Sequence, residues 1–194
     1  MTDKFRKIPT DLDGVTLIEP VVLSDGRGFF FESYNKREFE KIGIYTEYVQ
    51  DNHSASEKGV IRGLHFQKKH PQEKLVRVVR GSIFDVVVDL RSNSPGFGRS
   101  AGVTLSAAGA TIHIPAGFAH GFLALEENTH VLYKTSEFYY PEHDAGILWN
   151  DPQLKIHWPL EEYGIQKPIV SEKDRQLPRL SEIEPPFTFG GNQP

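Results

Sequence analysis

Titratable side chains interrupt stretches of this chain that otherwise resemble buried β-strands. Residues 60–66 read VIRGLHF, so Arg62 and His65 lie within an apolar, β-branched run. Burying a polar group without a partner costs roughly 2–7 kcal/mol, so such groups are expected to be paired or used. The pattern returns at four positions downstream, namely Lys74, Asp85, His120 and Tyr133. We interpret these residues as the lining of a pocket between strands.

Each of these residues also has an ordinary structural explanation. A lone histidine on a strand is more often a satisfied core or surface residue than a catalytic group. Tyr133 could be a barrel aromatic whose hydroxyl contacts water. Lys74 could be an edge-strand charge that discourages aggregation. Residue type alone therefore does not assign a function to these positions, and the arrangement of the surrounding strands must be considered.

Short strands dominate the chain. They are rich in Val, Ile, Phe, Tyr and Thr and are separated by turn residues. We expect ten strands, over residues 15–20, 28–33, 46–52, 59–66, 74–80, 82–90, 100–105, 111–115, 121–125 and 129–138. Many short strands at regular spacing indicate a sandwich or barrel.

Few helices are expected. Asn35 is a good N-cap, Glu38 follows three residues later as in a capping box, and Gly43 suits the end of the helix. We expect further short helices after residues 151–152 and 171–172. The tail, residues 185–191, is predicted to be loosely structured or to dock on a partner subunit.

Composition narrows the class of protein. The chain has 194 residues and no internal repeat or linker, so we expect one domain over residues 1–194 with its core at about 10–178. It contains no cysteine, which excludes disulfides and thiolate metal sites. The net charge of −4 with mixed signs argues against nucleic acid as a partner. No signal-like or membrane-spanning run is present, so we expect a cytoplasmic protein without membrane contact.

One motif gives the fold more sharply. The spacing of Gly109, Pro115, Gly117 and His120 resembles the second motif of the cupin superfamily. Members of this superfamily fold as small double-sheet jelly rolls. The first cupin motif normally supplies a His-x-His pair to a metal. Here the matching residues 65–67 read HFQ, so Gln67 replaces the second histidine. We expect an all-β, cupin-type double-sheet jelly roll with a few short helices and no metal site.

A series of blocks then brings a closer resemblance. DGRGFFFE, QDNHS, RGLHF, KLVR, IPAGFAHGF, YK and ILWND begin at residues 25, 50, 62, 74, 114, 133 and 147. In this order and spacing the chain resembles the dTDP-4-dehydrorhamnose 3,5-epimerase family, metal-free cupin enzymes of dTDP-L-rhamnose synthesis, over residues 10–178. The resemblance implies a dTDP-sugar substrate, no cofactor, and a homodimer in which an N-terminal strand crosses to the partner sheet.

The resemblance also assigns catalytic roles. The family's substrate is a 4-keto-6-deoxy sugar whose protons on carbons 3 and 5 flank the ketone and are weakly acidic. His65 would be the base, Tyr133 the proton donor on the opposite face, and Lys74 the group that stabilises the enolate oxygen. An unperturbed imidazole pKa of about 6.5 suits a base at working pH.

The carboxylate that orients His65 has two candidates. The family's partner aspartate falls on Asp174, which is far from His65 in sequence. Asp85 is the rival from local reading, because it lies mid-strand and one strand away. We favour Asp174 as the partner and interpret Asp85 as a structural carboxylate.

Further residues are expected to bind substrate. Tyr139 matches the aromatic residue that stacks on thymine, and Asp144 stands where the family commonly has glutamate. The remaining positions implied by the resemblance are Arg27, Glu32, Gln50, Asp51, Asn52, Arg62, His120 and Lys173. Arginine suits the diphosphate because its guanidinium can bind two oxygens at once.

Strand alternation conflicts with this site at one point. Arg62 and His65 are three residues apart, so a regular strand would send them to opposite faces. Gly63 could mark a bulge that redirects one of them. Alternatively, Arg62 reaches another part of the ligand or a neighbouring subunit's site.

Three functions fit the sequence. The first is 3,5-epimerisation of dTDP-4-dehydro-6-deoxy-D-glucose. The second is a related enzyme that epimerises one centre, isomerises the keto group or uses a different nucleotide. The third is a metal-dependent or merely sugar-binding cupin. Gln67 disfavours the metal enzyme, and Tyr133 with Lys74 disfavours the passive binder.

Overall fold

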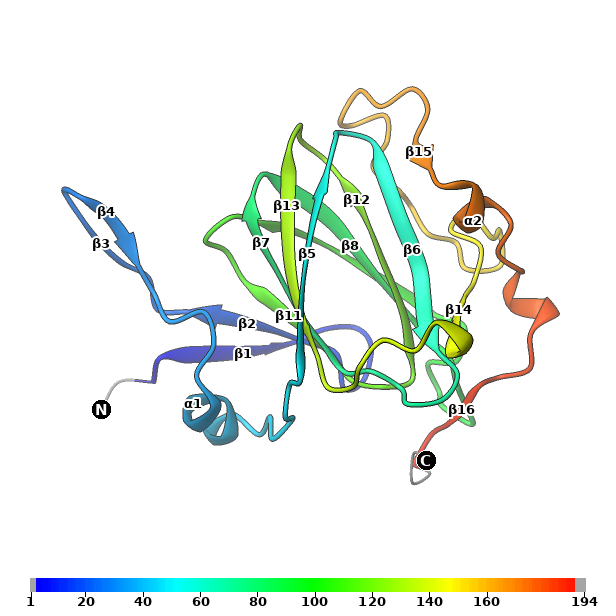
Figure 1. Cartoon of the computed structure of the whole chain (residues 1–194), viewed down its shortest axis with the longest axis horizontal. Helices are drawn as coiled ribbons and strands as arrows, with labels where there is room; N and C mark the ends of the chain where they lie inside the picture. Colours follow the sequence, from blue (N-terminus) through cyan, green and yellow to red (C-terminus); the bar gives the residue numbers. More distant parts are fainter. Residues whose placement is uncertain (1–2, 191–194) are drawn as a thin grey trace.

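The computed structural model describes residues 3–190 as two facing β-sheets with few helices (Figure 1). The first sheet contains, in spatial order, β1 (Phe5–Pro9), β2 (Thr16–Pro20), β11 (Thr111–Ile114), β7 (Lys74–Arg80), β13 (Thr129–Thr135) and β5 (Gln50–Ser56). The second contains β10 (Ser100–Ser106), β8 (Ser82–Asp89), β12 (Phe118–Ala124), β6 (Val60–Gln67) and β14 (Asp144–Gly146), while β15 (Ile169–Val170) pairs with β6. The predicted all-β double-sheet jelly roll is confirmed.

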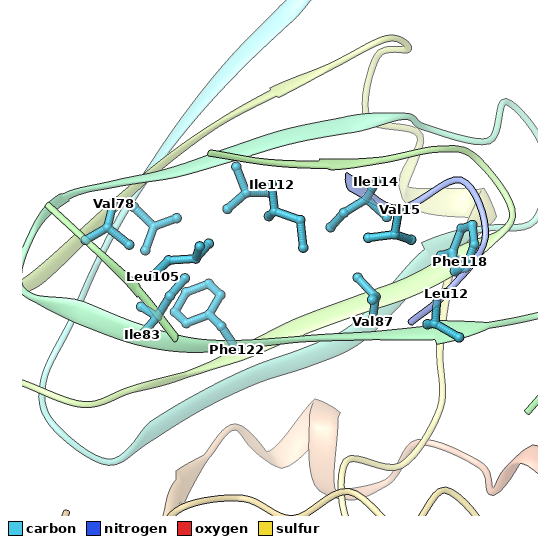
Figure 2. Packing of buried hydrophobic residues seen from close by; sticks show 12 residues of the cluster. Leu12, Val15, Val78, Ile83, Val87, Leu105, Ile112, Ile114, Phe118 and Phe122 are labelled. Carbon is cyan, nitrogen blue, oxygen red and sulfur yellow. The ribbon is translucent and has the colours of Figure 1, made fainter. Parts of the chain in front are cut away.

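The core lies between the sheets. Alternate residues of each strand point inward, and apolar side chains from both sheets meet there (Figure 2). Val78, Ile112 and Ile114 come from the first sheet, and Val87 and Phe122 face them from the second. Burying one such side chain stabilises the fold by about 1.5–3 kcal/mol. This packing holds the sheets at a fixed separation, which any site built between them requires.

The C-terminal third covers the outer face of the second sheet. Ile147, Leu154 and Trp158 pack there against strand residues such as Leu64 and Val88. The predicted helix after residues 151–152 is wrong, because that segment forms turns. The predicted helix after residues 171–172 is confirmed as α2 (Glu172–Arg175), and a 3-10 helix, η2 (Leu180–Glu182), follows it.

The tail departs from the expectation of a loose segment. Residues of β16 (Phe187–Thr188) pair in parallel with β9 (Arg91–Ser92) of the same chain. The Phe187 ring is buried and packs edge-on against Phe66, with 5.8 Å between ring centroids. The tail is therefore anchored to its own chain through Phe187; residue 191 lies outside the described residues.

The N-terminal region contains elements that the sequence did not predict. β1 pairs with β2 at the edge of the first sheet. The expected helix is α1 (Lys36–Lys41), where the Asn35 side chain accepts a hydrogen bond from the Glu38 amide. Phe39 on this helix packs against Phe5 of β1, with 4.9 Å between ring centroids. α1 thus covers part of the first sheet, since Phe39 packs with residues of β1, β2 and β7.

The predicted strand over residues 28–33 is instead one arm of a short hairpin. β3 (Leu23–Asp25) pairs with β4 (Gly28–Phe30), and the hairpin projects away from the two sheets (Figure 1). Val21, Leu23 and Phe29 are exposed on this hairpin and its approach, and Phe30 is 66% exposed. Exposed apolar residues gathered on a projecting element are typical of an interaction surface.

Strand boundaries differ from the predicted ranges by a few residues. β5 begins four residues later than predicted, β12 begins three residues earlier, and β13 ends at Thr135. η1 (Pro141–His143) follows β13 after an irregular stretch. Within residues 3–190, no helix has the length and apolar character needed to span a membrane.

Candidate active site

A cavity of about 570 Å³ opens between the two sheets. Its walls come from β6 and β12 on one side, β7 and β13 on the other, and the segment that carries β15 and α2. Nine of the residues predicted for the site line it, namely Arg62, His65, Lys74, His120, Tyr133, Tyr139, Asp144, Lys173 and Asp174. The sandwich therefore gathers most of the predicted site in one place.

His65 is held by a carboxylate from the far end of the chain. Its Nε2 lies 2.8 Å from Oδ1 of Asp174, and Oδ2 of the same aspartate accepts a hydrogen bond from the Gly63 amide at 3.2 Å. Burial would raise the pKa of Asp174, but the hydrogen bond and charge of His65 lower it overall. Asp174 is thus an anion that orients the imidazole and leaves Nδ1 for proton exchange.

Local structure explains how Asp174 reaches this position. Parallel pairing of β15 with β6 brings the chain alongside Ile61 just before α2 begins. Ser171 then caps α2, because its hydroxyl accepts a hydrogen bond from the Asp174 amide at 3.0 Å. The cap fixes the first turn and points Asp174 at His65.

Asp85 has a different partner. Its Oδ2 lies 2.8 Å from Nε2 of His120, and the carboxylate is fully buried. The structure therefore pairs His65 with Asp174, as the resemblance implied, and pairs Asp85 with His120. Two carboxylate-paired histidines therefore line the cavity side by side, since His65 and His120 are register partners between β6 and β12.

Lys74 and Tyr133 come from the opposite sheet. Burial lowers the pKa of Lys74 to about 8, against the opposing effect of the Asp144 and Asp85 charges. Burial raises the pKa of Tyr133, although the charge of Arg62 acts in the other direction. Lys74 is therefore a cation that loses its proton as the pH rises through about 8, and Tyr133 stays a phenol.

A bulge in β6 resolves the conflict between Arg62 and His65. The pairing of β6 with β12 shifts by one residue between these two positions, so both side chains line the same cavity. Gly63 adopts φ +117°, and a Cβ there would lie 2.6 Å from the Gly121 Cα. The predicted bulge at Gly63 is confirmed, and only glycine fits the close approach of the two backbones.

Arg62 is itself anchored by the neighbouring strand. Its Nε donates to Ser56 Oγ at 3.0 Å and its Nη2 to the carbonyl of Ala55 at 3.0 Å. A guanidinium tethered at one edge keeps further N–H donors for a ligand. Arg62 therefore faces the cavity of its own chain.

The mouth of the cavity carries an aromatic residue between charges. Asp144 pairs with Lys173 and accepts a hydrogen bond from the Tyr139 hydroxyl at 3.1 Å. The hydrogen bond to Asp144 raises the pKa of Lys173, so this lysine stays charged. Tyr139 is 51% exposed as a residue, which leaves its ring available to a planar ligand.

Known proteins match this fold and this sequence together. The model of the dTDP-4-dehydrorhamnose 3,5-epimerase family matches residues 9–182. The chain belongs to this family. A dTDP-4-dehydrorhamnose 3,5-epimerase from Methanothermobacter thermautotrophicus is 52% identical over 180 residues, which are 92% of this chain and 96% of the relative.

Solved structures extend the likeness to the fold. A 3,5-epimerase from Legionella pneumophila, in complex with dTDP-4-keto-L-rhamnose, has a TM-score of 0.88 at 43% identity and covers 93% of this chain and 95% of its own. A dTDP-4-dehydrorhamnose 3,5-epimerase from Bacillus anthracis, with TDP and PPi bound, has a TM-score of 0.85 at 48% identity. It covers 90% of this chain and 99% of its own. This chain thus has the cupin-type β-sandwich of the epimerases.

Two residues that were predicted to bind substrate lie away from the cavity. Arg27 is on the tip of the β3–β4 hairpin and pairs with Asp25 at 2.6 Å. Glu32 follows the hairpin and contacts Lys4 and Asn35. Because the hairpin projects outward (Figure 1), Arg27 and Glu32 do not reach the cavity of their own chain, and their role in substrate binding stays a prediction.

The predicted β5 residues divide between two faces of their sheet. Asp51 bonds Lys134 at 2.8 Å on the outer face and does not line this cavity, so its role in substrate binding stays a prediction. Asn52 is the register partner of Tyr133, and Gln50 donates to Asn52 at 2.8 Å. Strand alternation accounts for the division, since Asp51 lies between two inward-facing residues.

The structure adds residues that sequence analysis missed. Ser54 and Ser171 line the cavity. Ser171 had a detectable signal, since serine three residues before Asp174 is an N-cap pattern.

Gln67, which replaces a metal-binding histidine of the cupin motif, bonds backbone groups through its amide. Within residues 3–190, no group of three or more His, Cys, Asp or Glu is arranged to hold a metal ion.

Proposed function

We propose that this protein epimerises carbons 3 and 5 of dTDP-4-dehydro-6-deoxy-D-glucose and releases dTDP-4-dehydro-L-rhamnose. One observation carries the proposal beyond family membership. His65 with its Asp174 partner lies on one sheet, Tyr133 lies on the facing sheet, and both line one cavity. Inverting a carbon centre needs a base on one face and an acid on the other, and these two residues meet that need.

The chemistry uses only proton transfers. The ketone at carbon 4 acidifies the protons on carbons 3 and 5. His65 takes one of these protons through Nδ1, and the electron pair of the broken C–H bond moves onto the ketone oxygen. Tyr133 then delivers a proton to the other face of the same carbon, and the carbonyl re-forms. Inversion at the second carbon repeats these steps after the two residues regain their starting protonation states.

Charge placement favours each step. The enolate oxygen is an anion, and the buried ammonium of Lys74 stabilises it strongly because little water screens the cavity. Asp174 stabilises the imidazolium that His65 becomes. The high pKa of Tyr133 keeps the phenol protonated until the enolate accepts its proton.

The rest of the cavity suits a thymidine diphosphate. We assign the diphosphate to Arg62 and Lys173, which bring cations to one side of the cavity, and to His120, whose ring can hydrogen-bond a phosphate oxygen. Tyr139 at the mouth would stack on the thymine. Asn52 and Gln50 lie on the cavity face of β5 near Tyr133, where they can hydrogen-bond the sugar or phosphate.

A homodimer would complete this site. Arg27 and Glu32 belong to a hairpin region that cannot serve its own cavity and that exposes Leu23, Phe29 and Phe30. A second copy of the chain would bury those apolar side chains and could receive the two charged residues. The cytoplasmic location expected from the sequence stays a prediction.

Incubation with dTDP-4-keto-6-deoxy-D-glucose in deuterated water tests the reaction. Proton NMR should show deuterium at carbons 3 and 5 and conversion to the L-configured product. Deuterium at one carbon alone would assign the protein to single-centre epimerisation, the second candidate function. Absence of exchange at both carbons would overturn the proposal.

A further inference from the structure

Three glutamine amides hold the backbone of residues 137–140, the irregular stretch between β13 and η1. Gln50 accepts a hydrogen bond from the Tyr139 amide at 3.1 Å. Gln67 accepts from the Tyr140 amide at 2.8 Å and donates to the Phe138 carbonyl at 3.2 Å. Gln72 donates to the carbonyls of Glu137 and Phe138 at 3.0 and 3.3 Å. Side chains here make the bonds that a neighbouring strand would otherwise make.

Gln67 is the central member of this set. It is 3% exposed, and its amide nitrogen makes a second bond, to the carbonyl of His70 at 2.8 Å. Both N–H donors and the carbonyl acceptor are therefore used within one buried group. A neutral histidine ring has only one donor and one acceptor and could not make these three bonds. Glutamine is thus suited to this position for a reason independent of any metal.

These bonds bear on Tyr139, because packing does not fix its ring. Tyr139 is half exposed, and the contact of its hydroxyl with Asp144 restrains only the far end of the side chain. The backbone on both sides of Tyr139 must therefore set the direction of the side chain. That backbone is bonded by Gln67 at residues 138 and 140 and by Gln72 at residues 137 and 138.

We propose that Gln67 and Gln72 are positioning residues for nucleotide binding, which act by holding the backbone that presents Tyr139 to the thymine base. The proposal rests on the proposed function, since it takes Tyr139 as the stacking residue. Neither glutamine lines the cavity, and neither touches the reacting sugar in this arrangement. Their loss should therefore weaken nucleotide binding and leave the proton transfers intact.

Methionine substitutions test this assignment, because methionine keeps the length of glutamine and removes its hydrogen bonds. For Gln67→Met we expect KM for the dTDP-sugar and Kd for thymidine diphosphate to rise about tenfold, as expected when a base loses part of its stacking. kcat should change by less than about twofold. Gln153→Met is the matched control, since this exposed glutamine lies in a turn outside the cavity, and it should match the wild type.

A double variant separates positioning from general damage. In a Tyr139→Leu background, Gln67→Met should raise Kd by less than about twofold, because the ring that it positions is gone. Equal effects of Gln67→Met in both backgrounds, or a kcat loss that matches the KM change, would overturn the proposal. Failure of the wild type to bind thymidine diphosphate would instead overturn the proposed function.

Gln72→Met keeps the test decisive if Gln67→Met does not fold. Gln72 is only partly buried, so this variant should fold with an unchanged circular dichroism spectrum. It removes two of the bonds to the segment, and we expect KM to rise about threefold with kcat retained. An unchanged KM for a folded Gln72→Met would contradict the proposal.

Discussion

At the scale of single residues, the chemistry depends on which groups are charged. His65 has a buried anion beside it, Lys74 is a cation in a dry setting, and Tyr133 is a phenol that resists ionisation. The sequence predicted these three residues through short motifs. It could not show that burial shifts the pKa of Lys74, because burial depends on strands distant in sequence.

Replacing Asp174 tests the support given to the imidazole. Asp174→Asn keeps the size of the side chain and removes its charge, so the imidazolium formed during turnover loses its ion-pair partner. We expect kcat to fall about 10- to 100-fold, less than the 10²–10⁴-fold expected for His65→Asn. The acidic limb of the pH–rate profile should move to lower pH. A profile identical to that of the wild type would argue against this pairing in catalysis.

Tyr133→Phe separates proton removal from inversion. The variant keeps the ring and its packing but has no proton to deliver, whereas His65 and Lys74 can still form the enolate. In deuterated water, NMR should show substrate of unchanged configuration that has gained deuterium at carbon 3 or 5. Product formation should fall far more than exchange does. Equal loss of both would mean that Tyr133 binds the sugar or that another group supplies the proton.

The pKa of Lys74 is expected to set the alkaline limit of activity. Its pKa of about 8 means that the ammonium predominates below this pH and is lost as the pH rises through it. Since the neutral amine stabilises an enolate poorly, kcat/KM should decline above about pH 8. Lys74→Met should show a much lower rate without this alkaline limb. Lys74→Arg, which stays charged, is the control, and an unchanged limb in it would assign the limb to another group.

At the scale of elements, the site depends on strand pairings, and some of these are much easier to predict from the sequence than others. The longer strands were predicted within a few residues because alternation and turn residues mark them. β9, β15 and β16 have two residues each, too few for any periodic signal. β15 nevertheless brings Asp174 to His65, and this contact spans 109 positions of sequence. Family resemblance supplied that pair, because local pattern could only suggest Asp85.

The β6 bulge makes a prediction at this scale. A Cβ at Gly63 would lie 2.6 Å from the Gly121 Cα and 2.8 Å from the His120 carbonyl, so Gly63→Ala must push β6 and β12 apart. We expect a loss of about 2–4 kcal/mol in the free energy of unfolding, measured in urea, and loss of activity in the folded fraction. Gly164→Ala is the control, since its positive φ has no backbone nearby. Equal stability of the two variants would contradict this account of the bulge.

At the scale of the whole molecule, one chain leaves two features unexplained. The β3–β4 hairpin exposes apolar side chains, and it carries Arg27 away from the cavity (Figure 1). The sequence motifs predicted that Arg27 and Glu32 bind substrate, but a motif does not indicate whether a residue binds in its own chain or in a partner. A homodimer that exchanges hairpins would account for both features.

Complementation between two inactive variants tests this exchange. Arg27→Ala removes a substrate-binding side chain from the hairpin, and His65→Asn removes the base from the cavity. If the hairpin serves the partner, a mixed dimer contains one intact site, formed by His65 of one chain and Arg27 of the other. Random assembly of equal amounts should then restore about a quarter of wild-type activity at subsaturating substrate, since half of the dimers are mixed and each has one working site. If Arg27 serves its own chain, no site in the mixture has both residues and activity stays at the level of the parents. Sedimentation of each variant as a dimer is the control, and a stable monomer at micromolar concentration would refute the assembly itself.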